Sequence, residues 1–451
     1  MNDFEQGNIH YMAKEYYEAS ECYKRAIEQE PNNFIIYHNL GITLCQLGQD
    51  EEALKYFELP CQYGYVESFL SRGTALRSLG RYKDALATFA QTFVLDPRHP
   101  TAYSNYGNTL REFGLPDIAI PFLKLAQELK PGDVNFALNE SVCHLMKGDL
   151  VEGWKKYYAR WWYQSDKSFK PQLQGPEYDG TQDIQGKIVL VYYEQGFGDS
   201  IQFVRFAKVL QARGAMVVLV TKPQLYDLFK HSLPEIKVIN ADEQLPPYHY
   251  HVALMDLPKC FNTGINSIPY DTPYLSVSNE LKQEWQQRLG TKKKKRIGLL
   301  WSPNKAAFIT RFRRIELEQL LSIVSNDYEF VSLSYEVDDE ILDLLKKHNV
   351  KTFHENINGF YNTAGLISQL DLVISIDTVI PHLSGALGVP TWVMLTDYGC
   401  DWRWFMNRTD SPFYSCMKLF RQQNGTWDNV LQDIKTELNA RKLRGFLVNI
   451  T

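Results

Sequence analysis

Two short turns in the chain bring together side chains that could do chemistry. In the first turn, Gly196 and Gly198 precede Asp199 at the end of an apolar run. Glycines let the backbone approach a ligand closely, and a carboxylate in that place can act as a general base toward an acceptor hydroxyl. The structural alternative is a helix cap, with Asp199 as the N-cap and Gln202 completing a capping box. The residues alone leave both roles open.

The second turn joins a buried apolar run to a helix within residues 375–388. The backbone amides of Thr378 and Val379 would lie at the positive end of that helix, where a diphosphate binds well. Asp377 stands directly before them. His382, in the first turns of the helix, would face either the ligand or the protein core. We therefore predict that a diphosphate binds at this turn.

Two further groups of residues complete the candidate site. A bound diphosphate favours cations beside it, and several follow the strand predicted at residues 297–301. For at least one of the three arginines among them, an ordinary surface position is the alternative. These candidates are Lys305, Arg311, Arg313 and Arg314. Asp401 and Trp402 begin an aromatic, charged loop after the last predicted strand. They are predicted to contact acceptor or sugar, with Trp402 stacking on a ring or, alternatively, packing against the neighbouring domain.

Parallel sheets would position these turns, and the sequence predicts two of them. Residues 188–192 form a continuous apolar run, which is typical of a buried parallel strand, and alternating helices and strands follow it. The alternation starts again at residues 297–301. We therefore expect an α/β architecture of two Rossmann-like halves that face a cleft at the carboxyl ends of their strands. The halves would span residues 187–285 and 286–451.

Element boundaries can be predicted more finely in a few places. One helix is expected from residue 200 to about 211. A bridge at residues 274–290 is expected to join the two halves. After the last strand at 391–395, we expect a long irregular stretch and then a helix near 427–440.

The first third of the chain repeats with a period of about 34 residues. The glycines that anchor the units are Gly7, Gly41, Gly73 and Gly107, at spacings of 34, 32 and 34 residues. A small residue and then a bulky one follow each anchor, as in Ala19 and Tyr23 of the first unit. This is the tetratricopeptide pattern of two helices per unit with small residues where helices touch. We predict an α-helical solenoid of about five repeats over residues 1–165 and a linker at 166–186, with a short second helix in the unit that contains Pro60.

The concave face of such a solenoid is suited to an extended peptide. Three asparagines, Asn39, Asn105 and Asn139, recur two residues before the anchor position. An amide side chain donates and accepts at once, as a peptide backbone does, so these residues are predicted to bind a peptide. They could equally be polar residues of a solvated face.

Composition narrows the functional class. The chain has 48 basic and 53 acidic residues and a net charge of −5, which argues against an electrostatic nucleic-acid binder. The polar N-terminus and short apolar runs predict no secretion signal and no membrane span, so we expect a cytoplasmic protein. Its seven cysteines are scattered without a C-x-x-C pair, and neither a disulfide framework nor a metal site is predicted.

The second turn resembles the sugar-nucleotide-binding turn of the heptosyltransferase family of GT-B glycosyltransferases. The resemblance rests on Asp377, Thr378 and His382 with residues 386–390, and the turn at Asp199 is similar to the family's N-terminal loop. The whole chain resembles bacterial glycosyltransferases fused to tetratricopeptide repeats, and O-linked N-acetylglucosamine transferase shares that architecture. The resemblance implies a metal-independent enzyme with a nucleotide-sugar donor, no further cofactor, and Asp199 as the candidate base.

The main hypothesis is a glycosyltransferase that moves a sugar from a nucleotide-sugar to a hydroxyl acceptor, on a protein held by the repeats. One alternative is transfer to lipopolysaccharide or another glycan. A second is a binding scaffold that carries an inactive GT-B domain. The sugar, the acceptor and the stereochemical outcome stay open.

Overall fold

The computed structural model describes residues 2–162, 171, 173–269, 272–302 and 313–448, with side chains as far as residue 442. The chain divides into two compact units, Met1–Lys147 and Gly148–Thr451. Each unit is described by itself. None of the described helices is long and apolar enough to cross a membrane.

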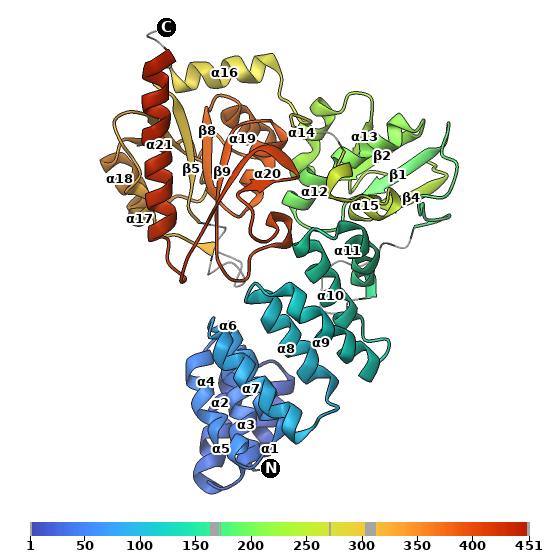
Figure 1. Cartoon of the computed structure of the whole chain (residues 1–451), viewed down its shortest axis with the longest axis vertical. Helices are drawn as coiled ribbons and strands as arrows, with labels where there is room; N and C mark the ends of the chain where they lie inside the picture. Colours follow the sequence, from blue (N-terminus) through green and yellow to red (C-terminus); the bar gives the residue numbers. More distant parts are fainter. Residues whose placement is uncertain (1, 163–170, 172, 270–271, 303–312, 449–451) are drawn as a thin grey trace. The chain divides into compact units, whose positions relative to one another are not determined.

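The first unit consists of successive helices, each packed against its neighbour (Figure 1). Glycines with positive φ, such as Gly80 and Gly114, end helices and turn the chain into the next one, as expected of a residue without a Cβ atom. The helices are α1 (Asp3–Met12), α2 (Tyr16–Gln29), α3 (Phe34–Gln46), α4 (Asp50–Tyr56), α5 (Glu58–Gln62), α6 (Val66–Ser78), α7 (Tyr82–Leu95), α8 (Pro100–Glu112), α9 (Pro116–Leu129) and α10 (Val134–Lys147).

The anchor glycines pack where the repeat pattern predicts small residues. A Cβ atom at Gly41 would lie 2.5 Å from a ring carbon of Phe57, and one at Gly73 would lie 2.5 Å from a ring carbon of Phe89. Real Cβ atoms do not come this close in a packed interior. The glycine therefore admits the bulky residue sixteen positions later, and the predicted helical repeats are confirmed. The short helix predicted around Pro60 is also found, because α4 stops at Tyr56 and a separate α5 follows.

The second unit begins with α11 (Leu150–Tyr157) and η1 (Tyr158–Trp162) and then forms a four-stranded parallel sheet. The strand order is β3-β2-β1-β4. The strands are β1 (Ile188–Tyr192), β2 (Met216–Thr221), β3 (Lys237–Asn240) and β4 (Tyr250–Ala253). The helical segments of this half are α12 (Phe197–Phe203), α13 (Arg205–Ala212), α14 (Pro223–Ser232), η2 (Leu254–Asp256), α15 (Leu257–Cys260) and η3 (Ile265–Ser267).

A seven-stranded sheet makes the other half of the second unit, in the order β10-β11-β9-β8-β5-β6-β7. All pairs are parallel except β10 with β11. The strands are β5 (Arg296–Leu300), β6 (Glu329–Ser332), β7 (Val350–Lys351), β8 (Leu372–Ile376), β9 (Thr391–Leu395), β10 (Asp410–Ser411) and β11 (Tyr414–Arg421). The helical segments are α16 (Asn279–Leu289), α17 (Leu317–Leu321), α18 (Asp339–Lys347), α19 (Phe360–Ile367), α20 (Val379–Ala386), η5 (Trp402–Trp404) and α21 (Asp428–Val448).

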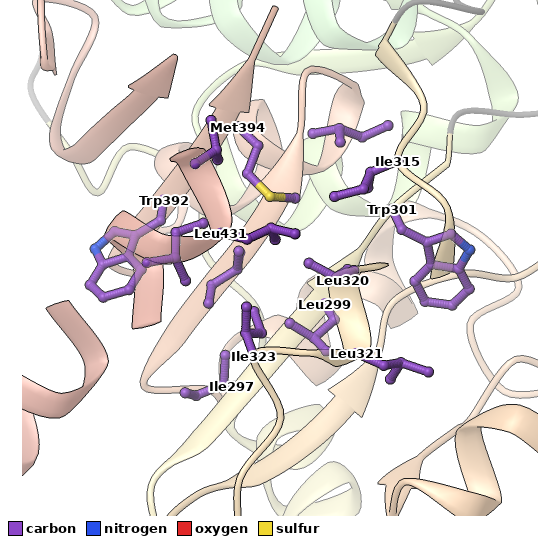
Figure 2. Close-up of a cluster of buried hydrophobic side chains, with 14 of the residues drawn as sticks. Ile297, Leu299, Trp301, Ile315, Leu320, Leu321, Ile323, Trp392, Met394 and Leu431 are labelled. Atoms are coloured by element: carbon purple, nitrogen blue, oxygen red, sulfur yellow. The ribbon is translucent and has the colours of Figure 1, made fainter. Parts of the chain in front are cut away.

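Apolar side chains on one face of this sheet form its core. Figure 2 shows Leu299 of β5, Met394 of β9 and Leu431 of α21 gathered with their neighbours. Each is at most 5% exposed, and burying a side chain of this size contributes about 1.5–3 kcal/mol. This core holds β8 and β9 at the centre of the sheet, so the turns that follow them start from fixed positions.

The predicted architecture is confirmed: a helical repeat region is followed by two Rossmann-like halves, an arrangement consistent with the GT-B fold. Two details of the prediction were wrong. The expected irregular stretch contains β11, and the helix expected at 200–211 is two helices, α12 and α13. The strand β11 was missed because polar residues such as Lys418 interrupt its apolar pattern, as is common near a sheet edge.

The first compact unit ends at Lys147 rather than near residue 165. The reason is that α11 and η1 pack within the second unit. The ring centroid of Trp154 lies 5.5 Å from that of Phe203 and 5.1 Å from that of Trp402. The aromatic residues of α11 thus contact both the α12 segment and the η5 segment.

Candidate functional site

Asp199 lies in the first turn of α12, which follows the carboxyl end of β1. Its Oδ2 atom accepts a hydrogen bond from the backbone N–H of Gly196 at 2.7 Å, and a carboxylate is favourable at this end of a helix. The N-cap is Gly196 rather than Asp199, so the predicted capping box with Gln202 does not form. The other carboxylate oxygen, Oδ1, is ion-paired with Arg403.

Arg403 joins residues from both α/β halves. Its Nε donates to Gln202 Oε1 at 3.0 Å, its Nη1 contacts both oxygens of Asp401 at 2.9 and 3.1 Å, and its Nη2 donates to Asp199. The guanidinium carbon also lies 4.2 Å from the ring centroid of Trp402. A planar guanidinium has the donors for this fan of contacts, which a lysine lacks.

Asp377 and the start of α20 form the second part of the site. Asp377 directly follows β8, and its Oδ2 is 2.8 Å from Nη1 of Arg313. Thr378 is the N-cap of α20, and its hydroxyl oxygen accepts a hydrogen bond from the Ile380 N–H at 3.2 Å. Thr378 and Val379 are half-buried. The predicted phosphate-binding residues therefore stand at the positive end of an eight-residue helix beside a paired carboxylate.

Asp401 and Asp377 respond differently to their surroundings. Burial raises the pKa of a carboxyl, but Arg403 and Arg313 outweigh it at Asp401 and lower the pKa there to about 2. At Asp377, burial outweighs the attraction of Arg313, and the pKa is raised. Asp401 therefore stays ionised, whereas Asp377 is the carboxyl of the pair that is easier to protonate.

His382 packs in the core beneath α12. Its Nδ1 is 2.9 Å from the hydroxyl of Tyr414, and its ring stacks on Trp404 with centroids 5.3 Å apart. Burial, followed by the positive charge of Arg403, lowers the pKa of His382 to about 3, so the ring is neutral at physiological pH. A Cβ atom at Gly198 would lie 2.9 Å from His382 Cδ2. Glycine at this position therefore lets α12 rest on α20. His382 lies in the core, and its contact with a ligand stays a prediction.

The other residues predicted for the site do not all lie beside Asp199 and Asp377. Trp402 is 5% exposed and lies among the rings of Trp154, Phe203 and Phe413, which is the packing role rather than sugar stacking. Arg314 is exposed and pairs with Glu316 at 3.2 Å, so it lies apart from the network that holds its neighbour Arg313. Lys305 and Arg311 lie outside the described residues, and their role stays a prediction.

Sequence reasoning missed one cation at the carboxyl edge of the first sheet. Lys222 directly follows β2, and its ammonium donates to the carbonyl oxygen of Gln195 and lies 4.8 Å from the ring centroid of Phe197. Burial lowers the pKa of Lys222, against the opposing effect of nearby Asp199. Its position after a strand end is the same signal that pointed to Asp199 and Asp377, and it could have been used.

A second cluster of charges lies deeper in the same unit. Arg160 of η1 makes two hydrogen bonds to Glu194 at 2.7 and 2.8 Å and an ion pair with Asp256 at 2.9 Å. The indole N–H of Trp161 donates to Asp256 at 2.9 Å. Burial raises the pKa of Glu194 to about 7, despite the opposing effect of Arg160. One guanidinium cannot fully neutralise two buried carboxylates.

The three asparagines of the repeat unit are half-buried. Asn39 donates through Nδ2 to the side-chain oxygen of Asn8 at 3.0 Å, and the same oxygen accepts from the Tyr23 hydroxyl at 2.8 Å. Asn39 of the second repeat is thus tied to the first repeat, whereas Asn105 and Asn139 stand at equivalent positions of later repeats. Peptide binding by these residues stays a prediction.

The geometry defines what the site can do. Asp199 of one α/β half pairs with Arg403. Arg403 belongs to the other half and also pairs with Asp401 of that half. A helix N-terminus beside Arg313 lies in the same region of the unit, where α12 and α20 pack together (Figure 1). Such a site can hold an anionic group at α20 and accept a proton at Asp199.

Comparison with known families supports the repeat region. Models of the tetratricopeptide repeat match residues 4–33, 22–55 and 70–134. The N-terminal part of the chain thus consists of tetratricopeptide repeats.

Two relatives differ in how much of the chain they match. The protein FlbA of Caulobacter vibrioides is 23% identical over 436 residues, which cover 89% of this chain and 72% of FlbA. The DnaJ homolog subfamily C member 7 of Mus musculus is 34% identical over 106 residues, which cover 23% of this chain and 22% of that protein. The likeness to FlbA therefore extends over both units.

Among solved structures, the glycosyl transferase family 9 protein of Veillonella parvula aligns with 53% of this chain and 87% of its own length. The sequence identity is 13% and the TM-score is 0.41.

Proposed function

We propose that this protein is a glycosyltransferase that takes a sugar from a nucleoside diphosphate sugar and transfers it to a hydroxyl group. The observation that carries the proposal is that Arg403 pairs with Asp199 of one α/β half and Asp401 of the other, while Arg313 pairs with Asp377 at the start of α20. The resemblance of the turns at Asp199 and Asp377 to those of heptosyltransferases supports the same reaction.

In the proposed reaction, the acceptor oxygen attacks the anomeric carbon of the donor sugar. The bond from that carbon to the diphosphate oxygen breaks, and the nucleoside diphosphate leaves with the bonding electrons. Asp199 takes the proton from the acceptor hydroxyl, so its carboxylate becomes the neutral acid. A general base contributes roughly 10²–10⁴-fold to the rate of such a step.

The leaving diphosphate would be stabilised by the second half. The backbone amides at the start of α20 form the positive end of the helix dipole. Arg313 adds a guanidinium that can donate hydrogen bonds to phosphate oxygens. Asp377 holds that guanidinium at 2.8 Å, and so positions it before the donor arrives. The predicted cations Lys305 and Arg311 would add to this group of charges.

The acceptor we propose is a protein held by the repeats. The support is the tetratricopeptide match together with the recurring asparagines, Asn39, Asn105 and Asn139, because a solenoid face suits an extended chain. Transfer to a glycan and a purely binding role for the α/β unit are the competing possibilities.

The test begins with the purified full-length chain and a panel of nucleoside diphosphate sugars. Titration calorimetry is expected to find one donor class that binds, and Asp377→Asn is expected to weaken it roughly tenfold because Arg313 loses its partner. Asp410→Asn serves as the matched control, since Asp410 is an exposed carboxylate paired with Arg408. If no member of the panel binds, the α/β unit is not a nucleotide-sugar transferase.

The acceptor requires a separate arm. Changing Asn39, Asn105 and Asn139 together to alanine should abolish the mass shift of modified proteins in an extract while donor hydrolysis continues. Unchanged protein modification would exclude presentation by this face. A product found only on glycans would favour the glycan alternative.

A further inference from the structure

Arg403 is held in place by groups other than Asp199. Gln202 accepts from its Nε, and both oxygens of Asp401 accept from its Nη1. The backbone N–H of Arg403 also donates to Asp401 at 3.0 Å. The plane of the guanidinium is therefore defined without Asp199, and Nη2 is the nitrogen that it presents to Asp199.

Both oxygens of Asp199 are engaged in this state. Oδ2 accepts from the Gly196 amide at 2.7 Å, and Oδ1 pairs with Arg403 Nη2. An acceptor hydroxyl that approaches Oδ1 therefore has to share this oxygen with Arg403. With these partners, neither oxygen of Asp199 is open to the proton of an acceptor.

The two arginines beside α20 share one property. Arg313 pairs with Asp377, and Arg403 pairs with Asp401 and Asp199. In Arg403, Nε and Nη1 are held by Gln202 and Asp401, so a diphosphate would meet this guanidinium at Nη2, the nitrogen that pairs with Asp199. Asp199 meets Arg403 through one oxygen at Nη2, whereas Asp401 meets it through both oxygens at Nη1 and also accepts from its backbone N–H.

We propose that Arg403 Nη2 is exchanged between Asp199 and the diphosphate of the donor. Without donor, Arg403 masks Asp199; with donor bound, the phosphate oxygens take the guanidinium and leave Asp199 Oδ1 open to the acceptor hydroxyl. Arg403 is thus a positioning residue that makes the base available after donor binding. This inference rests on the proposed function.

The exchange predicts that Asp199 and the diphosphate compete for one arginine. Asp199→Asn leaves a single side-chain oxygen for both the Gly196 amide and Arg403, so Arg403 is released. Nucleoside diphosphate should then bind roughly tenfold more tightly than to the wild-type chain, which corresponds to one charge-assisted contact. Arg403→Lys should bind it more weakly, because an ammonium cannot serve Gln202, Asp401 and the phosphate together.

The measurement is titration calorimetry of the full chain with UDP, GDP, ADP, CDP and dTDP, with folding checked by circular dichroism. Asp199→Ser is the second variant, since serine also caps a helix and lacks the charge, and Asp410→Asn is the control whose affinity should not change. Tighter binding to both Asp199 variants and weaker binding to Arg403→Lys support the exchange.

Unchanged or weaker binding to both folded Asp199 variants would overturn it, while diphosphate binding to the wild type would leave the proposed function standing. Failure of every diphosphate to bind the wild-type chain would instead remove the proposed function, and the exchange with it.

Discussion

The second unit contains two clusters in which one arginine faces two carboxylates, and they differ in burial. Arg160, Glu194 and Asp256 are 3%, 2% and 4% exposed at their side chains, whereas Arg403, Asp199 and Asp401 are 9%, 17% and 25% exposed. The first cluster ties η1 to the first sheet. The second joins the two α/β halves where water and ligands can reach its carboxylates. Similar charges therefore serve packing in one place and a site in the other.

The direction of the carboxyl pKa shift distinguishes Glu194 of the first cluster from Asp401 of the second. In the buried cluster, desolvation outweighs the attraction of Arg160 and raises the pKa of Glu194 to about 7. In the less buried cluster, the attraction of Arg403 and Arg313 outweighs burial and lowers the pKa of Asp401 to about 2. The contributions of these two carboxyl groups to stability therefore change with pH in opposite directions.

The largest effect is expected from removing the centre of the buried cluster. Arg160→Ala leaves Glu194 and Asp256 buried without their cation, which should cost about 3–5 kcal/mol of stability. Urea unfolding of the second unit, followed by tryptophan fluorescence, measures the change. A loss no larger than that of the surface variant Asp410→Asn would show that the buried cluster does not hold the unit together.

The next effect is the pH dependence of the buried cluster. Because the folded pKa of Glu194 is raised from 4.5 to about 7, its contribution to stability is present below pH 4.5 and is lost as the pH rises to 7. The loss should be on the order of 3 kcal/mol. Melting temperatures between pH 4.5 and 8 test it, and Glu194→Gln should flatten this part of the profile. A wild-type profile parallel to that of the variant would contradict the assignment.

The less buried cluster, around Arg403, should show a pH dependence of opposite sign and smaller size. The folded pKa of Asp401 is lowered from 3.8 to about 2, so its contribution is present above pH 3.8 and is lost as the pH falls to 2. The loss should be about 2 kcal/mol. Acid unfolding of Asp401→Asn beside the wild type measures it; equal acid sensitivity of the two proteins would show that Arg403 does not stabilise this carboxylate.

The smallest effects separate two neighbouring arginines. Arg313→Ala should weaken nucleoside diphosphate binding by about 1–2 kcal/mol, because Arg313 beside α20 is the proposed phosphate contact. Arg314→Ala should change binding and stability by less than about 0.5 kcal/mol, since its pair with Glu316 is exposed. Equal effects of the two substitutions would remove Arg313 from the site.

Local patterns predicted much of this structure. The glycine period identified the repeats because the same steric contact recurs, as at Gly41 and Gly73. The end of an apolar run located Asp199 and Asp377, since parallel strands end at one edge of a sheet. Each of these features either recurs regularly along the sequence or lies within a few consecutive residues.

The parts that were missed depend on contacts between distant residues. Arg403 meets Asp199 across 204 positions of the chain, and Arg160 meets Glu194 across 34. Nothing near Trp402 in the sequence shows that Trp154 covers it. Lys222 follows a strand end, so the pattern that identified Asp199 and Asp377 could also have identified it. The partners of Arg403 could not be predicted in this way, because they come together only in the folded structure of the two halves.

The central claim is that the cluster around Arg403 is a sugar-transfer site with Asp199 as its base. The most direct measurement is the release of nucleoside diphosphate from the donor that binds, by the full-length wild type, Asp199→Asn and Asp410→Asn, with water or an added acceptor. Turnover by the wild type and Asp410→Asn, with a loss of roughly 10²-fold or more in Asp199→Asn, is the predicted result. Equal turnover in all three proteins, or none in the wild type, would contradict the claim.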